Sequence, residues 1–317
     1  MQTAYSPSQQ NWIEVIQSYV QLTKPRIIFL LLITTAGAMW IASDGAVDWG
    51  VVLGTLVGGA LASGSANTIN CFVDRDIDRV MERTQWRPLP SGRIQPKSAL
   101  IFAITLALLA FAIILATSNL LSALLAMAGI AVYVGVYTLW LKRSSTQNIV
   151  IGGAAGAIPP LVGWSAVTGD LPWGAWVLFA IVFCWTPPHF WALALMIQDE
   201  YAKVGVPMLP VVKGGKPTAQ QILIYTVLLL PITLLLVYPL GIMGVVYGLS
   251  ALGLGLWFVI KAVKLLRLEG DRVYARSLFK YSVLYLALLY TAMAIDSLLP
   301  ANLSVNRLIA YLGNFRA

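Results

Sequence analysis

The chain has 317 residues, of which 59% are hydrophobic and 11% are charged. Soluble domains are about half apolar and about one-quarter charged, so this composition excludes a soluble globular protein and indicates an integral membrane protein. The net charge of +8 raises the question of nucleic-acid binding, but the charges are placed as in a membrane protein. We therefore expect one integral-membrane domain over residues 1–317 and no nucleic-acid partner.

Long apolar runs separated by short polar stretches predict the membrane spans. A helix of about 20 apolar residues crosses a bilayer, so the sequence predicts an all-α, polytopic fold with nine spans. An N-terminal segment at 1–25 precedes the core at 26–299, and a tail follows at 300–317. No signal peptide is expected, because a polar stretch precedes the first run and no small-residue cleavage pattern follows it. The expected spans are 26–43, 50–71, 99–117, 120–141, 149–168, 173–197, 220–239, 241–262 and 279–299.

The basic residues predict the orientation. Lys and Arg concentrate before the first expected span and in the loops after spans two, four, six and eight, whereas the remaining loops carry Asp44, Asp48 and Asp170. Under the positive-inside rule, this alternation places the N-terminus and the basic loops in the cytoplasm and the C-terminus outside.

Three polar residues at the cytoplasmic end of span two carry the strongest chemical signal. Asn70, Asp74 and Asp78 are spaced i, i+4, i+8, so a helix places them on one face along roughly 12 Å, while Asp76 points nearly the opposite way. Carboxylate and amide oxygens suit Mg²⁺ held together with substrate phosphates. A solvated helix end is the alternative interpretation of this row.

The loop after this row is basic. Arginine side chains match phosphate oxygens in bidentate fashion, so a metal held beside them is the arrangement that a diphosphate leaving group needs. The same residues could instead be ordinary positive-inside anchors. The candidate diphosphate ligands of this loop are Arg79, Arg83, Arg87, Arg93 and Lys97.

A second acidic site ends span six on the same side of the membrane. Asp199 and Glu200 could complete a two-metal site with the first row, or they could be helix-end charges paired with Lys203, which is itself a candidate diphosphate ligand. Lys142, Arg143 and Asn148 flank the start of span five and could face either substrate or lipid headgroups.

The single histidine, His189, lies in span six, roughly 15 Å deeper than Asp199 along a helix. An ionisable residue at this depth suggests a functional site, and neutral imidazole is a common haem ligand. Trp185 and Trp191 could wall a flat ligand. A structural, hydrogen-bonded histidine is the alternative.

Two cysteines, Cys71 and Cys184, lie inside expected spans without a metal-binding spacing. They are interpreted as packing residues.

The N-x-x-x-D-x-x-x-D pattern at Asn70, Asp74 and Asp78 resembles the signature of the UbiA family of intramembrane prenyltransferases. Other stretches are similar to the haem-modifying branch of that family, and the likeness covers roughly residues 20–300. One departure is that quinone-type members usually carry a second D-x-x-x-D, whereas Lys203 stands four residues after Asp199 here. The stretches are 74–79 (DRDIDR), 87–93 (RPLPSGR), 148–153 (NIVIGG), 185–191 (WTPPHFW) and 205–212 (GVPMLPVV).

The resemblance implies a bacterial inner-membrane enzyme whose nine helices surround a central cavity. It implies transfer of a farnesyl group from farnesyl diphosphate to the 2-vinyl group of haem B, with Mg²⁺ as cofactor and water addition giving haem O. It further implies catalytic roles for Asn70, Asp74, Asp78 and Asp199, the first three with Asp199 and Glu200 as metal ligands. Expected partners are the lipid bilayer and a downstream haem A synthase or terminal oxidase.

Two other interpretations remain at this point. A related prenyltransferase acting on a quinone precursor or a chlorin would share the Asp row but would not need His189. A transporter or non-enzymatic haem-binding protein would need polar groups along a continuous path, whereas the carboxylates here gather at one end of the spans.

Overall fold

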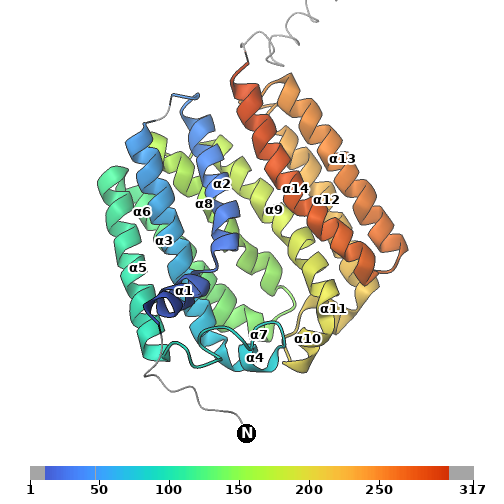
Figure 1. Cartoon of the computed structure of the whole chain (residues 1–317). Helices are drawn as coiled ribbons and strands as arrows, with labels where there is room; N and C mark the ends of the chain where they lie inside the picture. The colour runs from blue at the N-terminus through green and yellow to red at the C-terminus, as the bar shows by residue number, and fades with distance from the viewer. Residues whose placement is uncertain (1–10, 47, 300–317) are drawn as a thin grey trace, which may run out of the picture.

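The computed structural model describes residues 11–46 and 48–299, and in this part of the chain helices are joined by loops and turns, without strands (Figure 1). The expected tail at 300–317 and residues 1–10 of the expected N-terminal segment at 1–25 lie outside the described residues. The helices are α1 (Trp12–Thr23), α2 (Pro25–Ala42), α3 (Trp49–Val73), α4 (Arg75–Val80), α5 (Pro96–Thr117), α6 (Leu120–Ala131), α7 (Lys142–Ser144), α8 (Asn148–Thr168), α9 (Trp173–Met196), α10 (Gln198–Lys203), α11 (Leu209–Lys213), α12 (Gly215–Leu234), α13 (Val245–Arg267) and α14 (Arg272–Ser297), with a π-helical segment at Val132–Leu141 between α6 and α7.

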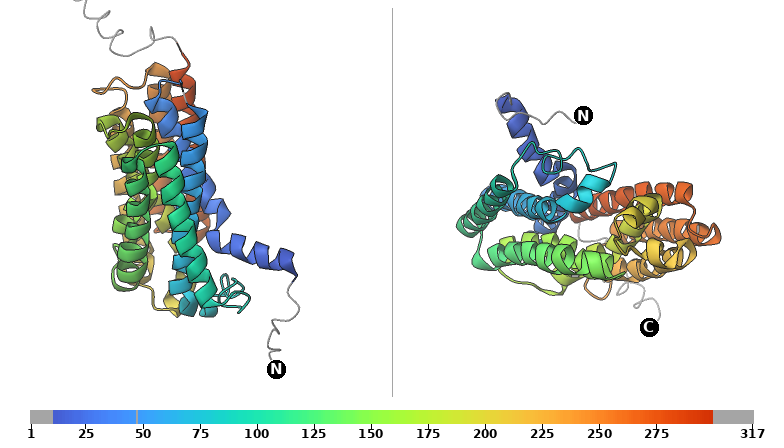
Figure 2. Two further views of the ribbon diagram at one scale, coloured as in Figure 1. Left: turned by 90° about the vertical axis from the view of Figure 1, so that its left-hand side faces the viewer. Right: turned by 90° about the horizontal axis from the view of Figure 1, so that it is seen from below.

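Nine stretches of the described chain are helical, long and apolar enough to cross a membrane, which confirms the predicted all-α, nine-span fold. They are α2, α3, α5, the continuous stretch Leu120–Ser144, α8, α9, α12, α13 and α14. Each packs against the next along the chain, and α14 returns to contact α2, so the bundle closes into a ring. The view from below in Figure 2 shows this ring.

The first six predicted spans agree with the structure to within three residues, but the last three differ more. Helix α12 begins at Gly215, directly after Gly214 with φ +81°, and α14 begins at Arg272, where the Asp271 side chain accepts a hydrogen bond from the Tyr274 amide at 2.7 Å. Both helices extend beyond the apolar run into polar residues. Hydropathy marks the part of a helix within lipid, whereas caps decide where the helix begins.

Helix α1 was not predicted as a separate element. It ends at Lys24, which has φ +54°, and α2 then begins at Pro25. This left-handed residue turns the chain sharply, so α1 runs across the direction of the spans rather than along it (Figure 2). It lies at the end of the bundle that also holds α4, α7, α10 and α11 (Figure 1). We call this end the loop end; it is the predicted cytoplasmic side.

Close helix contacts depend on small residues, as the Gly- and Ala-rich sequence of α8 suggests. Gly163 of α8 faces α2 so closely that an added Cβ would collide with the main-chain oxygen of Thr35, whereas an added Cβ at Gly156, on the same helix, would meet nothing within 4 Å. The two glycines thus differ in packing although both lie in one helix.

Gly163→Ala is therefore expected to lower the free energy of unfolding by about 1–3 kcal/mol, because the clash is with backbone and helices α2 and α8 must separate. Gly156→Ala, the matched control, should be neutral or stabilising by up to about 1 kcal/mol. Denaturant unfolding of both variants in detergent measures the difference. Equal stability of the two variants would contradict this account of the α2–α8 contact.

Both cysteines are free and buried, in agreement with their interpretation as packing residues. Cys71 belongs to a cluster with Leu22 of α1, while Cys184 lies in the large core to which α2, α8, α9, α12, α13 and α14 contribute. Thus α1 is anchored to α3 on its buried side.

Candidate functional site

The polar row at the end of α3 is continuous across a helix junction. Asp74 ends α3 and precedes α4, and the amides of Asp74 and Asp78 donate to the carbonyls four residues earlier, at 2.9 and 2.8 Å. The helical spacing is therefore preserved through the junction. Asn70, Asp74 and Asp78 are 4%, 1% and 3% exposed, whereas Asp76 is exposed, so the first three share the inward face as their spacing predicts.

Asp74 is the most enclosed carboxylate. Its Oδ2 accepts hydrogen bonds from the Asn70 amide at 2.6 Å and from the Lys142 ammonium. Its Oδ1 is buried without a hydrogen-bond partner among the described residues, and Arg143 Nη2 lies 3.7 Å from it. A buried carboxylate oxygen in this state is costly unless a further donor or a cation reaches it.

Asp78 is bound by the loop that follows it. Arg87 Nη1 donates to both carboxylate oxygens, at 2.9 and 2.8 Å. Burial is the largest single effect and would lower the pKa of Arg87, but attraction to Asp78 and other nearby groups, together with the hydrogen bonds to Asp78, raises the pKa above its ordinary value. The loop at 81–95 is thereby held over the carboxylate row.

Asp76 faces away from this centre. Arg143 donates to both of its oxygens, at 2.8 and 2.7 Å, and this hydrogen bonding lowers the pKa of Asp76 to about 2. Arg143 therefore stands between the exposed Asp76 and the buried Asp74. Asp76 has a partner of its own and does not contribute to the buried face.

Two contributors to the site were missed from the sequence. Lys24, between α1 and α2, donates from Nζ to the Asn70 side-chain oxygen at 2.7 Å. Thr138, in the π-helical segment, accepts from the Asn70 amide at 3.3 Å and donates to the Tyr133 carbonyl at 2.8 Å. π-Helical turns are frequent at functional sites, and here the segment brings Thr138 and then Lys142 against the polar row.

The second acidic site lies at α10, after α9 ends. Asp199 is exposed and binds Arg272 of α14 at 2.5 and 2.8 Å, which lowers the pKa of Asp199. Glu200 has a buried Oε2 without a hydrogen-bond partner among the described residues. The alternative pairing with Lys203 is not observed, because Lys203 binds Glu82 at 3.2 Å.

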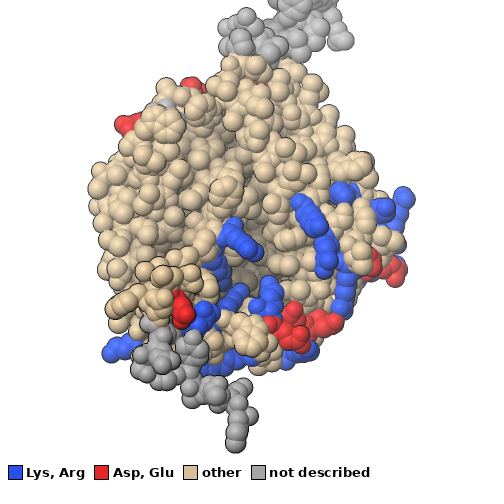
Figure 3. Space-filling view, viewed as in Figure 1, with Lys and Arg blue, Asp and Glu red and all other residues tan. Residues whose placement is uncertain are grey.

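The two acidic sites are joined at the loop end. Besides the Lys203–Glu82 ion pair, the positive charge of Arg83 acts on Tyr201, although burial is the larger effect and raises the pKa of Tyr201. The loop after α4 and helix α10 are therefore in direct contact. In Figure 3, basic and acidic side chains gather over this end, and the face is hollowed above them.

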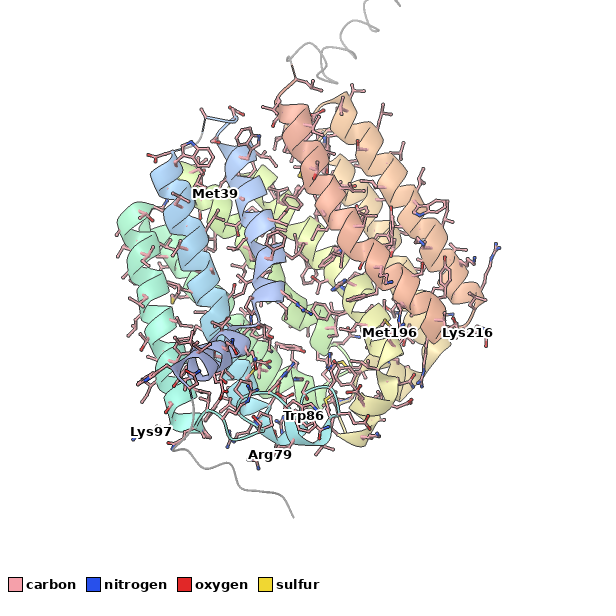
Figure 4. All side chains as sticks on the ribbon, viewed as in Figure 1. Met39, Arg79, Trp86, Lys97, Met196 and Lys216 are labelled. Atoms are coloured by element: carbon pink, nitrogen blue, oxygen red, sulfur yellow. The ribbon has the colours of Figure 1, made fainter. Side chains whose placement is uncertain are left out.

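The predicted basic ligands are not all at the row. Arg87, Lys142 and Arg143 reach its carboxylates, and buried Asn148 begins α8 beside them, with its amide 3.5 Å from the Lys142 carbonyl. Arg93 instead contacts Ser18, Gln21 and the Trp86 carbonyl. Arg79 and Lys97 are exposed, and Figure 4 shows Lys97 at the edge of the bundle, at the start of α5.

His189 lies in α9, which continues through Pro187 and Pro188. Its Nδ1 is 2.7 Å from the Ser282 hydroxyl, and that hydroxyl donates to the Phe279 carbonyl at 2.7 Å. Because the hydroxyl proton is already used, Nδ1 must donate and Nε2 carries the lone pair. No residue among 11–46 and 48–299 hydrogen-bonds Nε2.

Aromatic rings cover both faces of His189. Trp185 stacks on one face at 4.4 Å between centroids and Phe279 on the other at 4.6 Å. The Trp185 indole donates to the Ser282 carbonyl at 2.7 Å, so its orientation is held by hydrogen bonding. Trp191 is 1% exposed and packs against Tyr225, which makes it part of the core.

The donor set fits a hard divalent cation only in combination with a substrate. No cluster of three or more His, Cys, Asp or Glu side chains occurs within the described ranges. However, three buried side-chain oxygens at the loop end have no donor there: Asp74 Oδ1, Asn148 Oδ1 and Glu200 Oε2. Mg²⁺ commonly takes one or two carboxylates and completes its shell with water and phosphate oxygens, so this sparse set is adequate.

Comparison with known proteins identifies the class. The UbiA prenyltransferase family matches residues 31–302, and the chain belongs to this family.

Within the family, the chain is similar to proteins named protoheme IX farnesyltransferase. The Cyanothece protein is 62% identical over 309 residues, covering 98% of this chain and 95% of the relative. The Acaryochloris marina protein is 64% identical over 280 residues, covering 88% and 86% of the two chains.

Solved structures share the fold at lower identity. A digeranylgeranylglyceryl phosphate synthase has a TM-score of 0.74 at 22% identity and covers 90% of this chain and 99% of its own. A UbiA homologue from Archaeoglobus fulgidus bound to DMAPP and Mg²⁺ has a TM-score of 0.66 at 17% identity, covering 88% and 99%.

Proposed function

We propose that this chain is a protoheme IX farnesyltransferase, which joins farnesyl diphosphate, haem B and water to form haem O and diphosphate. The main support is the buried row of Asn70, Asp74 and Asp78, whose carboxylates are paired with cations. The chain is also 62% identical to a relative named for this activity. Most of the chain is covered by that likeness, so the proposal concerns the whole protein.

The diphosphate would bind between the polar row and the basic side chains. Arg87, Lys142 and Arg143 already lie at the carboxylates and can turn their donors to phosphate oxygens without leaving the site. Arginine forks match these oxygens well and remain charged throughout. Lys97 is at the edge of the bundle and is not included in this set.

Mg²⁺ would be held by Asp74, Asp78 and Asn70, with Glu200 and Asp199 contributing from α10, and when bound it neutralises the diphosphate as a leaving group. The buried, partnerless oxygens of Asp74 and Glu200 support this assignment. Before substrate binds, Lys142 and Arg87 pair with Asp74 and Asp78 and balance their negative charge.

Departure of diphosphate leaves an allylic farnesyl cation, which the haem vinyl carbon attacks. A carbon–carbon bond forms, and water then adds to the new cation at the porphyrin side, releasing a proton. Neither step requires a protein nucleophile. The role of the chain is to orient the two substrates and to exclude water from the first cation, and His189 is the proposed contact to haem.

The predicted orientation is kept as part of the proposal. The chain is a multi-pass membrane protein by its nine apolar helices and its family. We place it in a bacterial inner membrane with the loop end in the cytoplasm, where a soluble diphosphate headgroup is available. A haem A synthase or a terminal oxidase is the proposed downstream partner, since haem O is poorly soluble in water.

The direct test is incubation of the purified protein with haem B, farnesyl diphosphate and Mg²⁺, followed by mass spectrometry of the extracted haem. In the expected product one vinyl group of haem B has become a hydroxyethylfarnesyl group, so the mass rises by one farnesyl and one hydroxyl group, and its formation should stop when Mg²⁺ is chelated. Parallel incubations replace haem B with a quinone precursor or a chlorin. Prenylation of either in preference to haem B would replace this function with the related prenyltransferase activity.

A further inference from the structure

Helix α1 has an apolar face that the protein leaves open. Its side chains at 12, 13, 16 and 20 are exposed, and Trp12 is 82% exposed. Helix α1 has two other faces. Leu22 and Ser18 are buried against the bundle on one of them, while Gln17 and Gln21 are exposed and polar on the other. A helix with three such faces, lying across the span direction, fits the interface between headgroups and acyl chains (Figure 2).

A groove of about 530 Å³ separates this face from the start of α5. Its lining is mainly apolar: Ile16, Tyr19, Val20, Thr23, Ser98, Ile101 and Phe102. The rings of Tyr19 and Phe102 meet edge to face at 4.8 Å, which fixes the separation of the two helices. Beyond the groove, α5 presents Ile104 and Leu108 outward, so an acyl chain could continue along the span.

The rim of the groove is basic. Lys97 is exposed in the first turn of α5, next to the lining residue Ser98, and makes no ion pair with a described residue. Arg93 holds the neighbouring loop to α1 through Ser18 and Gln21. A cation at the headgroup level above an apolar groove matches a lipid with an anionic headgroup.

The floor of the groove is linked by hydrogen bonds to the polar row at Asn70, Asp74 and Asp78. Thr23 lines the groove, and its carbonyl accepts a hydrogen bond from Asn67 at 3.0 Å. The next residue, Lys24, donates to Asn70 at 2.7 Å. Gly64 allows Thr23 to pack closely against α3, since a Cβ at residue 64 would lie 3.2 Å from the Thr23 methyl carbon. An interaction that holds α1 against α3 therefore also holds Lys24 at the polar row.

We propose that the groove between α1 and α5 binds an anionic phospholipid of the surrounding leaflet, with an acyl chain against Ile16, Val20 and Ile101 and its phosphate at Lys97, and that this lipid holds Lys24 on Asn70. The lipid site is independent of the proposed reaction. The coupling to Asn70 rests on the proposed function, because it acts through the diphosphate site.

The test uses the full chain in nanodiscs containing a trace of phosphatidylglycerol or phosphatidylcholine with a photoreactive acyl chain. After illumination, labelled peptides are identified by mass spectrometry. Labelling is expected to concentrate at residues 16–23 and 98–102, and to be about fivefold stronger with phosphatidylglycerol, as one interfacial cation provides. Even labelling around the bundle, or equal labelling by both lipids, would overturn the proposal.

Matched variants separate the parts of the site. Lys97→Gln should remove the preference for phosphatidylglycerol, whereas Lys213→Gln, at an exposed lysine of α11, should retain it. Ile16→Asp should abolish groove labelling by both lipids, whereas Gln17→Asp adds the same charge on the polar face and should not. If a photoreactive farnesyl analogue labels the groove and the phospholipids do not, the groove serves the prenyl tail and the proposal fails.

The KM for farnesyl diphosphate tests the proposed coupling between the lipid and the contact of Lys24 with Asn70. In nanodiscs of phosphatidylcholine alone, the KM for farnesyl diphosphate should rise about fivefold relative to discs containing phosphatidylglycerol, and Lys97→Gln should show the higher KM in both. An unchanged KM in labelled protein would overturn the coupling while leaving the lipid site. Failure to form haem O in any lipid would instead contradict the proposed function, because labelling needs no turnover.

Discussion

Asp74→Asn and Asp78→Asn are each expected to lower turnover by at least about 100-fold, while Asp76→Asn keeps most of it. Asp74 and Asp78 are buried on one face with Asn70, and an amide at either position loses the negative charge that balances Lys142 or Arg87 and that we propose to bind the metal. Asp76 is exposed, and its partner Arg143 also lies 3.7 Å from Asp74. Haem O formation under saturating substrates measures the three effects.

Folding must be separated from chemistry in this series, because the loss of one partner from a buried ion pair can destabilise a protein. Asp74→Glu provides the control: it keeps the charge and the attraction to Lys142, but moves the carboxylate by one methylene. A displacement of about 1 Å is enough to cost about 100-fold in rate. Thermal melting of each variant in detergent reports folding independently.

Two results would contradict a site built on the shared inward face of Asn70, Asp74 and Asp78. Near-normal turnover in folded Asp74→Asn protein would remove this carboxylate from the site. An equal loss in Asp76→Asn, with unchanged melting, would show that the exposed position matters as much as the buried ones. In either case the inward face of α3 and α4 would not define the diphosphate site.

The fold was largely readable from the sequence because hydropathy and helical periodicity are local properties. The nine apolar runs gave the spans, and the i, i+4, i+8 spacing placed Asn70, Asp74 and Asp78 on one face. The prediction was weaker where helices leave the lipid. Arg272 begins α14 seven residues before the expected span, since a capped helix does not end at the edge of the apolar run.

The pairings within the site were not readable, because they join distant parts of the chain. Asp199 was compared with Lys203, four residues away, but its partner is Arg272 on α14. The ion pair of Asp74 with Lys142 depends on the π-helical segment, whose extra residue per turn no sequence pattern signalled. Lys24 was seen only as a topological charge before the first span, although it reaches Asn70.

The sequence also overestimated how many cations of the basic loop after α4 lie at the carboxylate row. Five cations between Arg79 and Lys97 were treated alike, yet Arg87 reaches Asp78 and Arg93 holds the loop to α1. Loop conformation decides which cation points inward, and the turns that set it depend on tertiary contacts. Spacing within a loop therefore identified the chemistry of this region but not its geometry.

The second large effect is expected at His189, which we predict to ligate the haem iron through Nε2. Its ring faces are covered by Trp185 and Phe279, but a metal binds a nitrogen lone pair in the ring plane, at the edge. The hydrogen bond from Nδ1 to Ser282 fixes the tautomer that leaves Nε2 available. His189 is 9% exposed, so the residue is not fully enclosed.

A structural histidine would use the same Nδ1 hydrogen bond, so the two roles must be separated by keeping that bond. In His189→Asn the side-chain amide can donate to Ser282 in place of Nδ1, but nothing replaces Nε2. We expect a melting temperature above that of His189→Gln, a shifted Soret band of bound haem and a loss of turnover of about 100-fold or more, because the vinyl carbon is misplaced. His189→Gln, which places its terminal amide nearer the Nε2 position, should lose the Ser282 bond and melt lower. An unaltered Soret band and normal haem O yield in His189→Asn would restrict His189 to a structural role, since the variant lacks Nε2 but retains a donor to Ser282.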